Sequence, residues 1–181
     1  MLNKNNDIYK FKDFADVHIP RWDELPVIDL YLDQVVNFIE KYLVITLPDN
    51  KNDKSNKEKL ITKTMINNYV QQKIMEPPEK KKYNRKHIAY LFVICILKQV
   101  YSINDIDKLI KLALKTSKPE KAYNKFCDAL ESAIAFTFAG KEYIDDSHLT
   151  FERYILKNVV QSFADKLYVQ KVFLEPIRDR F

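Results

Sequence analysis

The sequence contains a single glycine, Gly140, among 181 residues. Antiparallel sheets that are built from tight hairpins generally place glycine in their turns. The near-absence of glycine therefore argues against a sheet-based fold. Long segments in which apolar residues recur at helical spacing point the same way, and we predict an all-α fold. The length fits one large domain or one domain with an appendage.

Metal-binding and catalytic patterns are also lacking. The two cysteines, Cys95 and Cys127, are far apart and lie in apolar helical runs, so a thiolate zinc site is not expected. The three histidines are widely separated, and no glycine-rich loop could hold a phosphate. His87, in the first turn of a predicted helix, is expected to face solvent or phosphate. We predict that the protein is not an enzyme and has no cofactor.

The sequence lacks a long apolar run. Its longest, residues 88–97, is about half the length that a membrane-spanning helix needs. The first residues, Met1-Leu-Asn-Lys-Asn-Asn6, do not resemble the apolar centre of a signal peptide. Buried thiols fit a reducing compartment. We therefore expect no membrane segment and a cytoplasmic location.

Positive charge is concentrated in one segment. The chain has a net charge of +5, whereas residues 51–86 carry eleven cations against four acids, which gives +7. The rest of the chain is thus slightly acidic. A local excess of this kind is what neutralisation of nucleic-acid phosphates requires. The alternative interpretation is an ordinary solvated run of charges.

Three parts follow from the pattern: an N-terminal arm (1–28), a central helical region (29–115) and a C-terminal helical region (116–181). In the central region a helix over 29–43 precedes a polar loop (46–60), which we expect to be mobile because it has almost nothing to bury. Residues suited to begin or end helices divide the remainder. They are Thr62, Asn84, Ser102, Pro119 and Thr150 at helix starts and Gly140 at a helix end. The last helix is predicted to run from about 150 to 174.

The helix predicted over 62–73 has an unusual outer face. It offers Lys63, Thr64, Asn67, Asn68, Gln71 and Gln72, and no acidic residue occurs between Lys59 and Met75. Asparagine is a poor helix former. Amides can pair with adenine, and threonine can contact a base edge or a thymine methyl group. This face favours DNA reading; the alternative is a plain solvated helix.

A second basic group follows the turn at Pro77-Pro78. It contains Lys80, Lys81 and Lys82, with Tyr83 and Arg85 close behind. Lysine and arginine side chains at such a position can hold the phosphate backbone. Tyr83 has an alternative role, which is to pack on the helix that begins after Asn84.

These blocks resemble the MerR-type winged helix-turn-helix. The similar blocks are Thr62-Lys-Thr-Met-Ile-Asn-Asn-Tyr69, Ile74-Met-Glu-Pro-Pro78, Tyr83-Asn-Arg-Lys-His-Ile88 and Tyr101-Ser-Ile-Asn-Asp-Ile106. The resemblance implies a DNA-binding core with a shortened wing, followed by two long C-terminal helices. By the same resemblance, Thr64 and Asn67 face the groove, Tyr69 contacts phosphate or braces the helix, and Lys81, Lys82 and Tyr83 form the wing. From the charge and polarity of the residues we also expect Lys63 and Asn68 to approach bases or phosphates and Arg85 to hold the DNA backbone. The chain departs from that pattern at Asn67, where the family has arginine, and in the long insertion over 44–61.

A second resemblance covers nearly the whole chain. The motifs are Leu25-Pro-Val-Ile-Asp-Leu-Tyr31, the Thr62–Tyr69 block, Lys81-Lys-Tyr83 and Ile94-Cys-Ile-Leu-Lys-Gln99. They are similar to an uncharacterised family of low-GC Gram-positive bacteria. The resemblance adds support for the all-α fold and the MerR-like core, and that family has no assigned function.

Taken together, the sequence predicts a sequence-specific double-stranded-DNA-binding protein that acts as a transcriptional regulator and forms a homodimer. Residues 116–181 would either build the dimer or complete the core of the monomer. The alternative is a non-catalytic helical module that binds a protein partner through the same basic surface. The sequence identifies no effector.

Overall fold

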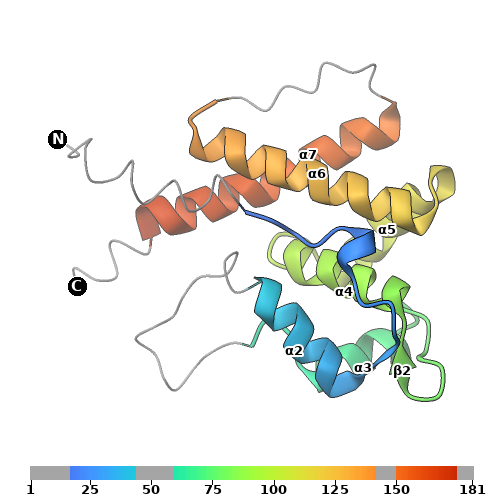
Figure 1. The fold of residues 1–181 in the computed structure, drawn as a ribbon. Coiled ribbons are helices and arrows are strands. Elements are labelled where there is room, and N and C mark those ends of the chain that lie inside the picture. Colours follow the sequence, from blue (N-terminus) through green and yellow to red (C-terminus); the bar gives the residue numbers. More distant parts are fainter. Residues whose placement is uncertain (1–16, 44–58, 142–149, 175–181) are drawn as a thin grey trace. The chain divides into compact units, whose positions relative to one another are not determined.

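The computed structural model describes residues 17–43, 59–141 and 150–174 (Figure 1). These residues contain six α-helices and a two-stranded antiparallel sheet, so the fold is mainly helical, and the all-α prediction missed only this short sheet. Most of the predicted polar loop, residues 46–58, lies outside the described residues. Within the described ranges, no helix combines the length and the apolar character needed to cross a membrane.

The chain divides into two compact units at positions that differ from the predicted boundaries. One, here called the core unit, comprises residues 20–124. The other, the C-terminal unit, contains the described residues of 1–19 and 125–181. The predicted boundaries after residues 28 and 115 would detach segments that pack within the core unit. For example, the Tyr123 hydroxyl donates to the Pro20 carbonyl at 2.8 Å.

The core unit begins with a short 3₁₀ turn, η1 (Trp22–Glu24), strand β1 (Leu30–Tyr31) and helix α2 (Leu32–Leu43). A helix from residue 29 was predicted, but the helix starts three residues later. The reason is that β1 pairs antiparallel with β2 (Lys82–Tyr83), with Leu30 opposite Tyr83 and Tyr31 opposite Lys82. This pairing commits Leu30 and Tyr31 to extended backbone.

Three further helices complete most of the core unit: α3 (Lys63–Gln71), α4 (Arg85–Leu97) and α5 (Ile103–Thr116). Each begins at the predicted cap. Thr62 Oγ1 accepts from the Met65 amide at 3.1 Å, Asn84 Oδ1 from the His87 amide at 3.2 Å, and Ser102 Oγ from the Asp105 amide at 3.3 Å. Most residues of α4 are buried, as its apolar composition predicts, and α2, α5 and β2 pack against it.

The last helices are α6 (Pro119–Phe138) and α7 (Phe151–Val169). Pro119 opens α6 as predicted, and Gly140 follows its end with φ +66°, the left-handed conformation expected of a helix-ending glycine. The final helix is α-helical only to Val169 and continues as a π-helical segment, η3 (Gln170–Leu174). In the C-terminal unit, Phe138 and Tyr168 make an edge-on contact with ring centroids 5.3 Å apart.

Candidate nucleic-acid interface

Helix α3 presents the polar face that the sequence predicts. The side chains of Lys63, Thr64, Asn67, Asn68 and Gln71 are exposed, while that of Ile66, on the opposite side, is fully buried. No acidic residue lies in the helix. At about 1.5 Å per residue its nine residues span roughly 13 Å. An α-helix with its side chains is about 10–12 Å across, and a major groove about 12 Å wide admits a helix of that diameter.

The N-terminal end of α3 is joined to the first turn of α2 by an ion pair. The Lys63 ammonium contacts the Asp33 carboxylate, and both side chains are mostly exposed. An exposed pair of this kind contributes less than about 1 kcal/mol to stability. Lys63 is therefore held in place in the free protein, yet its ammonium remains free to exchange Asp33 for a phosphate.

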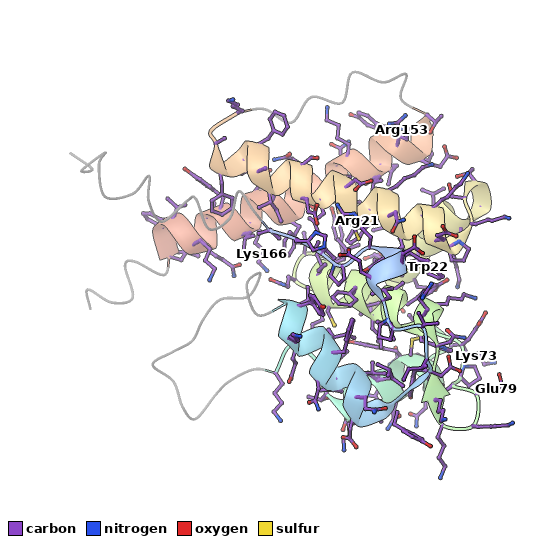
Figure 2. All side chains as sticks on the ribbon, viewed as in Figure 1. Arg21, Trp22, Lys73, Glu79, Arg153 and Lys166 are labelled. Atoms are coloured by element: carbon purple, nitrogen blue, oxygen red, sulfur yellow. The ribbon has the colours of Figure 1, made fainter. Side chains whose placement is uncertain are left out.

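The C-terminal end of α3 has an unusual residue at a helix-ending position. Lys73 has φ +58°, and the amides of Lys73 and Ile74 donate to the carbonyls of Val70 and Tyr69, both at 3.0 Å. This is the Schellman arrangement, in which the left-handed residue is usually glycine. Figure 2 labels Lys73 and Glu79 on the segment that leads from α3 towards β2. The left-handed lysine redirects the chain into that segment.

A tight turn over residues 79–82, here called the wing turn, follows. Lys80 and Lys81 have φ +48° and +65°, and the Lys82 amide donates to the Glu79 carbonyl at 2.8 Å. Positive φ at both central residues is the feature of a type I′ turn, which normally takes Asn-Gly. Both lysine side chains are exposed, and neither has an ion-pair partner in the part of the chain that the structure describes. The turn therefore projects two unpaired cations, and Lys80 joins the predicted contact residues.

The segment formed by β1 and the first turn of α2 contacts both the wing turn and α3. The Lys82 ammonium lies over the Tyr31 ring, 5.2 Å from its centroid, and Lys63 pairs with Asp33. Tyr31 and Asp33 are two positions apart, so their Cα atoms are separated by at most about 7 Å. One short segment thus contacts Lys63 of α3 and Lys82 of β2. We call the exposed polar residues of α3, together with the three lysines of the wing turn, the basic surface. It comprises Lys63, Thr64, Asn67, Asn68, Gln71, Lys80, Lys81 and Lys82.

Two aromatic residues of the predicted site support this surface from inside. Tyr83 is 3% exposed and packs edge-on against the His87 ring, 5.5 Å between centroids. It therefore takes the alternative role that the sequence left open. Tyr69 is half-buried; its burial, with a smaller effect from Cys95, raises the pKa of Tyr69. Both phenols stay protonated at neutral pH and brace α3 and β2 against α4.

The expectation that His87 faces solvent or phosphate is wrong. The side chain is 5% exposed, its Nδ1 accepts from the Asn84 amide at 3.1 Å, and its Nε2 lies 3.2 Å from the Glu76 carbonyl. Burial lowers the pKa of His87, so the ring is neutral near pH 7. The neutral ring can donate from Nε2 to Glu76, which fixes the segment that precedes the wing turn.

Arg85 contacts two residues of η1, and nothing in the sequence predicts these contacts. Its guanidinium lies over the Trp22 ring, 5.9 Å from the centroid, and 3.9 Å from the Asp23 carboxylate. Trp22 is labelled on η1 in Figure 2. The Trp22 amide in turn donates to Asn124 at 2.8 Å. Arg85 therefore holds the N-terminal segment of the core unit in place, and its predicted contact with the DNA backbone stays a prediction.

Comparison with known proteins supports the division into units. No curated protein and no solved structure matches the chain. A family model described as a domain of unknown function, DUF1836, matches residues 20–126. These bounds are nearly those of the core unit, so the matched domain is the part that carries the basic surface. Because the match covers more than half of its residues, the chain belongs to the DUF1836 family.

Proposed function

We propose that the protein binds double-stranded DNA sequence-specifically and acts as a cytoplasmic transcriptional regulator. One observation carries the proposal: an acid-free helix face and a lysine turn are anchored on the same short segment of β1 and α2. Base edges need amides and hydroxyls, while phosphates need nearby cations. The basic surface supplies both groups together.

The proposed roles follow from exposure and chemistry. Thr64, Asn67 and Asn68 contact base edges, since their side chains are exposed, Thr64 in the first turn of α3 and the two asparagines in its middle. Lys80 and Lys81 contact phosphate, because they are exposed and unpaired at the wing turn. Lys63 would join them after leaving Asp33. Tyr69 and Tyr83 position these elements from behind, and Arg85 holds the DNA backbone beside η1.

The proposal includes a MerR-like arrangement of the core unit and a homodimer. In this arrangement α3 is the reading helix, and the wing is reduced to β2 and its turn. The paired strand β1 supports the wing, in place of a second wing strand that follows it in the chain. Two copies of α3 in a dimer would address half-sites about 34 Å apart on one face of the duplex.

Fluorescence anisotropy with labelled duplexes tests the proposal. A duplex selected from a random pool is compared with random duplexes over salt concentrations from about 50 to about 200 mM. The variants are Asn67→Ala and the double variant Lys80→Gln/Lys81→Gln. Asn104→Ala is the matched control, because Asn104 is an exposed asparagine in α5, outside the basic surface.

The two variants should change DNA binding in different ways. Asn67→Ala should lose about 1–3 kcal/mol of preference for the selected duplex while random duplexes bind as before. The double lysine variant should weaken every duplex and reduce the salt slope by about 1.8, at about 0.9 per phosphate contact. Asn104→Ala should match the wild type. Absence of binding to any duplex at about 50 mM salt would reject the proposal.

A second candidate function has its own observation. Val27 and Ile28, which precede β1, are 83% and 72% exposed, and Tyr31 is 54% exposed. Apolar side chains beside a basic surface suit a protein partner with an acidic rim. In this case the protein would be a non-catalytic interaction module. Salt-dependent but sequence-independent binding to duplexes, with no preference for the selected one, would favour it over the regulator.

A further inference from the structure

A cavity of about 330 Å³ lies in the core unit at the C-terminal end of α3. Its wall is formed by Val70 of α3, Ile74 of the following segment, Tyr90 of α4 and Ile110 of α5. A cavity of this size lies at the lower end of the range for small-molecule sites. With about 30 Å³ per water molecule in the liquid, it has room for roughly a dozen non-hydrogen atoms.

The charged residues that line the cavity are three lysines and two acids, so one lysine has no acidic partner there. The two carboxylates are each paired with a lysine: Glu76 with Lys86 at 2.8 Å, and Asp107 with Lys111 at 2.6 Å. Lys73 also lines the cavity, and it has no ion-pair partner among the described residues. The acids are thus already satisfied, and the remaining charge favours an anion.

Neutral groups in the wall add a hydrogen-bond donor and an apolar surface. Burial of Tyr90, helped by the nearby carboxylates, raises the pKa of Tyr90, so its hydroxyl keeps a proton to donate. His87, which also lines the cavity, is kept neutral by burial. The aliphatic side chains of Val70, Ile74 and Ile110 suit a ring or a branched hydrocarbon. A ligand that matches both the polar groups and the aliphatic wall has one acidic end and one apolar end.

We propose that this cavity binds a small organic carboxylate with an apolar body about the size of one aromatic ring. Its carboxylate meets Lys73 and the Tyr90 hydroxyl, while its apolar body lies against Val70 and Ile110. The left-handed backbone of Lys73 holds this lysine at the rim, at the point where the chain leaves α3. The inference goes beyond DNA binding and does not depend on it.

Three probes with the same ring separate charge from shape: benzoate, benzyl alcohol and benzylamine. Each is titrated into the full chain while amide chemical shifts are followed by NMR. The variant is Lys73→Gln, and the matched control is Lys121→Gln, an exposed lysine of α6 that does not line the cavity. Both substitutions remove one surface charge and leave the apolar wall intact.

Benzoate should give saturable shifts at the amides of residues that line the cavity, and benzylamine should give none. Lys73→Gln should weaken benzoate about fivefold, towards the affinity of benzyl alcohol, as loss of one exposed ion pair predicts. Lys121→Gln should bind like the wild type. Equal binding of the three probes, equal effects of the two variants, or no benzoate shifts at the cavity would each overturn the assignment.

Discussion

Replacing Lys80 with asparagine and Lys81 with glycine should raise the stability of the fold and lower its affinity for DNA. The turn has positive φ at both lysines, and Asn-Gly is the pair that a type I′ turn favours. The double variant should therefore fold more stably than the wild type. It also removes the two unpaired cations that we assign to phosphate. A more stable protein that binds DNA less tightly is an outcome that misfolding cannot produce.

The size of both effects can be worked out. A residue other than glycine in the left-handed region costs about 1–2 kcal/mol of stability. Relieving that strain is partly offset, because a new glycine raises the entropy of the unfolded chain and lowers stability by about 0.5–1 kcal/mol. The free energy of unfolding should rise by about 1 kcal/mol, which raises the Tm by about 2–4 °C in a chain of this size. Loss of two phosphate contacts should lower affinity about 30-fold at about 0.15 M salt.

Calorimetry and anisotropy on the same samples measure the two effects. A conservative variant, Lys80→Arg/Lys81→Arg, keeps both charges and both strained positions, so its Tm and its DNA affinity should stay near those of the wild type. A charge-matched control, Lys115→Gln/Lys121→Gln, removes two exposed lysines of the same core unit. It should lose little affinity, which separates local contact from total charge.

Two results would refute the reasoning. An unchanged salt slope in the Asn-Gly variant would mean that the wing turn does not contact phosphate. A lower Tm would mean that the left-handed conformation of Lys80 and Lys81 is not the one that the folded chain adopts.

Three other substitutions give expected outcomes of known sign. Asp33→Asn should raise DNA affinity about fivefold at about 0.15 M salt in the anisotropy assay, because it frees Lys63 and removes a carboxylate beside the backbone; weaker binding would contradict this. The folded-state pKa of His87 lies below its ordinary 6.5, so the unfolded chain takes up the proton first as the pH falls. The stability that the neutral ring gives should therefore be present above pH 6.5 and lost on acidification, and urea unfolding at about pH 7 and about pH 5.5 should show a smaller pH effect in His87→Gln. Lys73→Gly should raise the free energy of unfolding by about 0.5–1 kcal/mol and the Tm accordingly, and a fall would argue against the left-handed helix end.

Much of the helical architecture was predictable because its signals are local. Thr62, Asn84 and Ser102 cap the helices they were expected to cap. Each cap is a hydrogen bond to an amide only three residues later, so it does not depend on contacts with distant segments. The exposed face of α3 was predictable for a similar reason. Once Ile66 is assigned to the interior, helical periodicity places Asn67 and Asn68 outside.

The remaining features depend on contacts between distant segments. Leu30 and Tyr31 extend instead of entering a helix because β2, some fifty residues later, pairs with them. The sequence gives no turn signal at Lys80 and Lys81, where two lysines replace the usual Asn-Gly. His87 looks exposed beside two cations, yet the Glu76 carbonyl and the Asn84 amide give its ring partners in the interior.

The run from Lys73 to Lys82 has a consequence for hydrogen exchange. It contains every non-glycine residue with positive φ among the described residues, and each costs about 1–2 kcal/mol. Amides there should exchange through local opening, whereas those of the buried helix α4, which begins three positions later, should exchange only when the whole unit unfolds. A partner that holds this run would slow its exchange and leave α4 unchanged. Binding would therefore be visible as protection confined to the eight amides of this run, which has none at Pro77 and Pro78, without any displacement of the backbone.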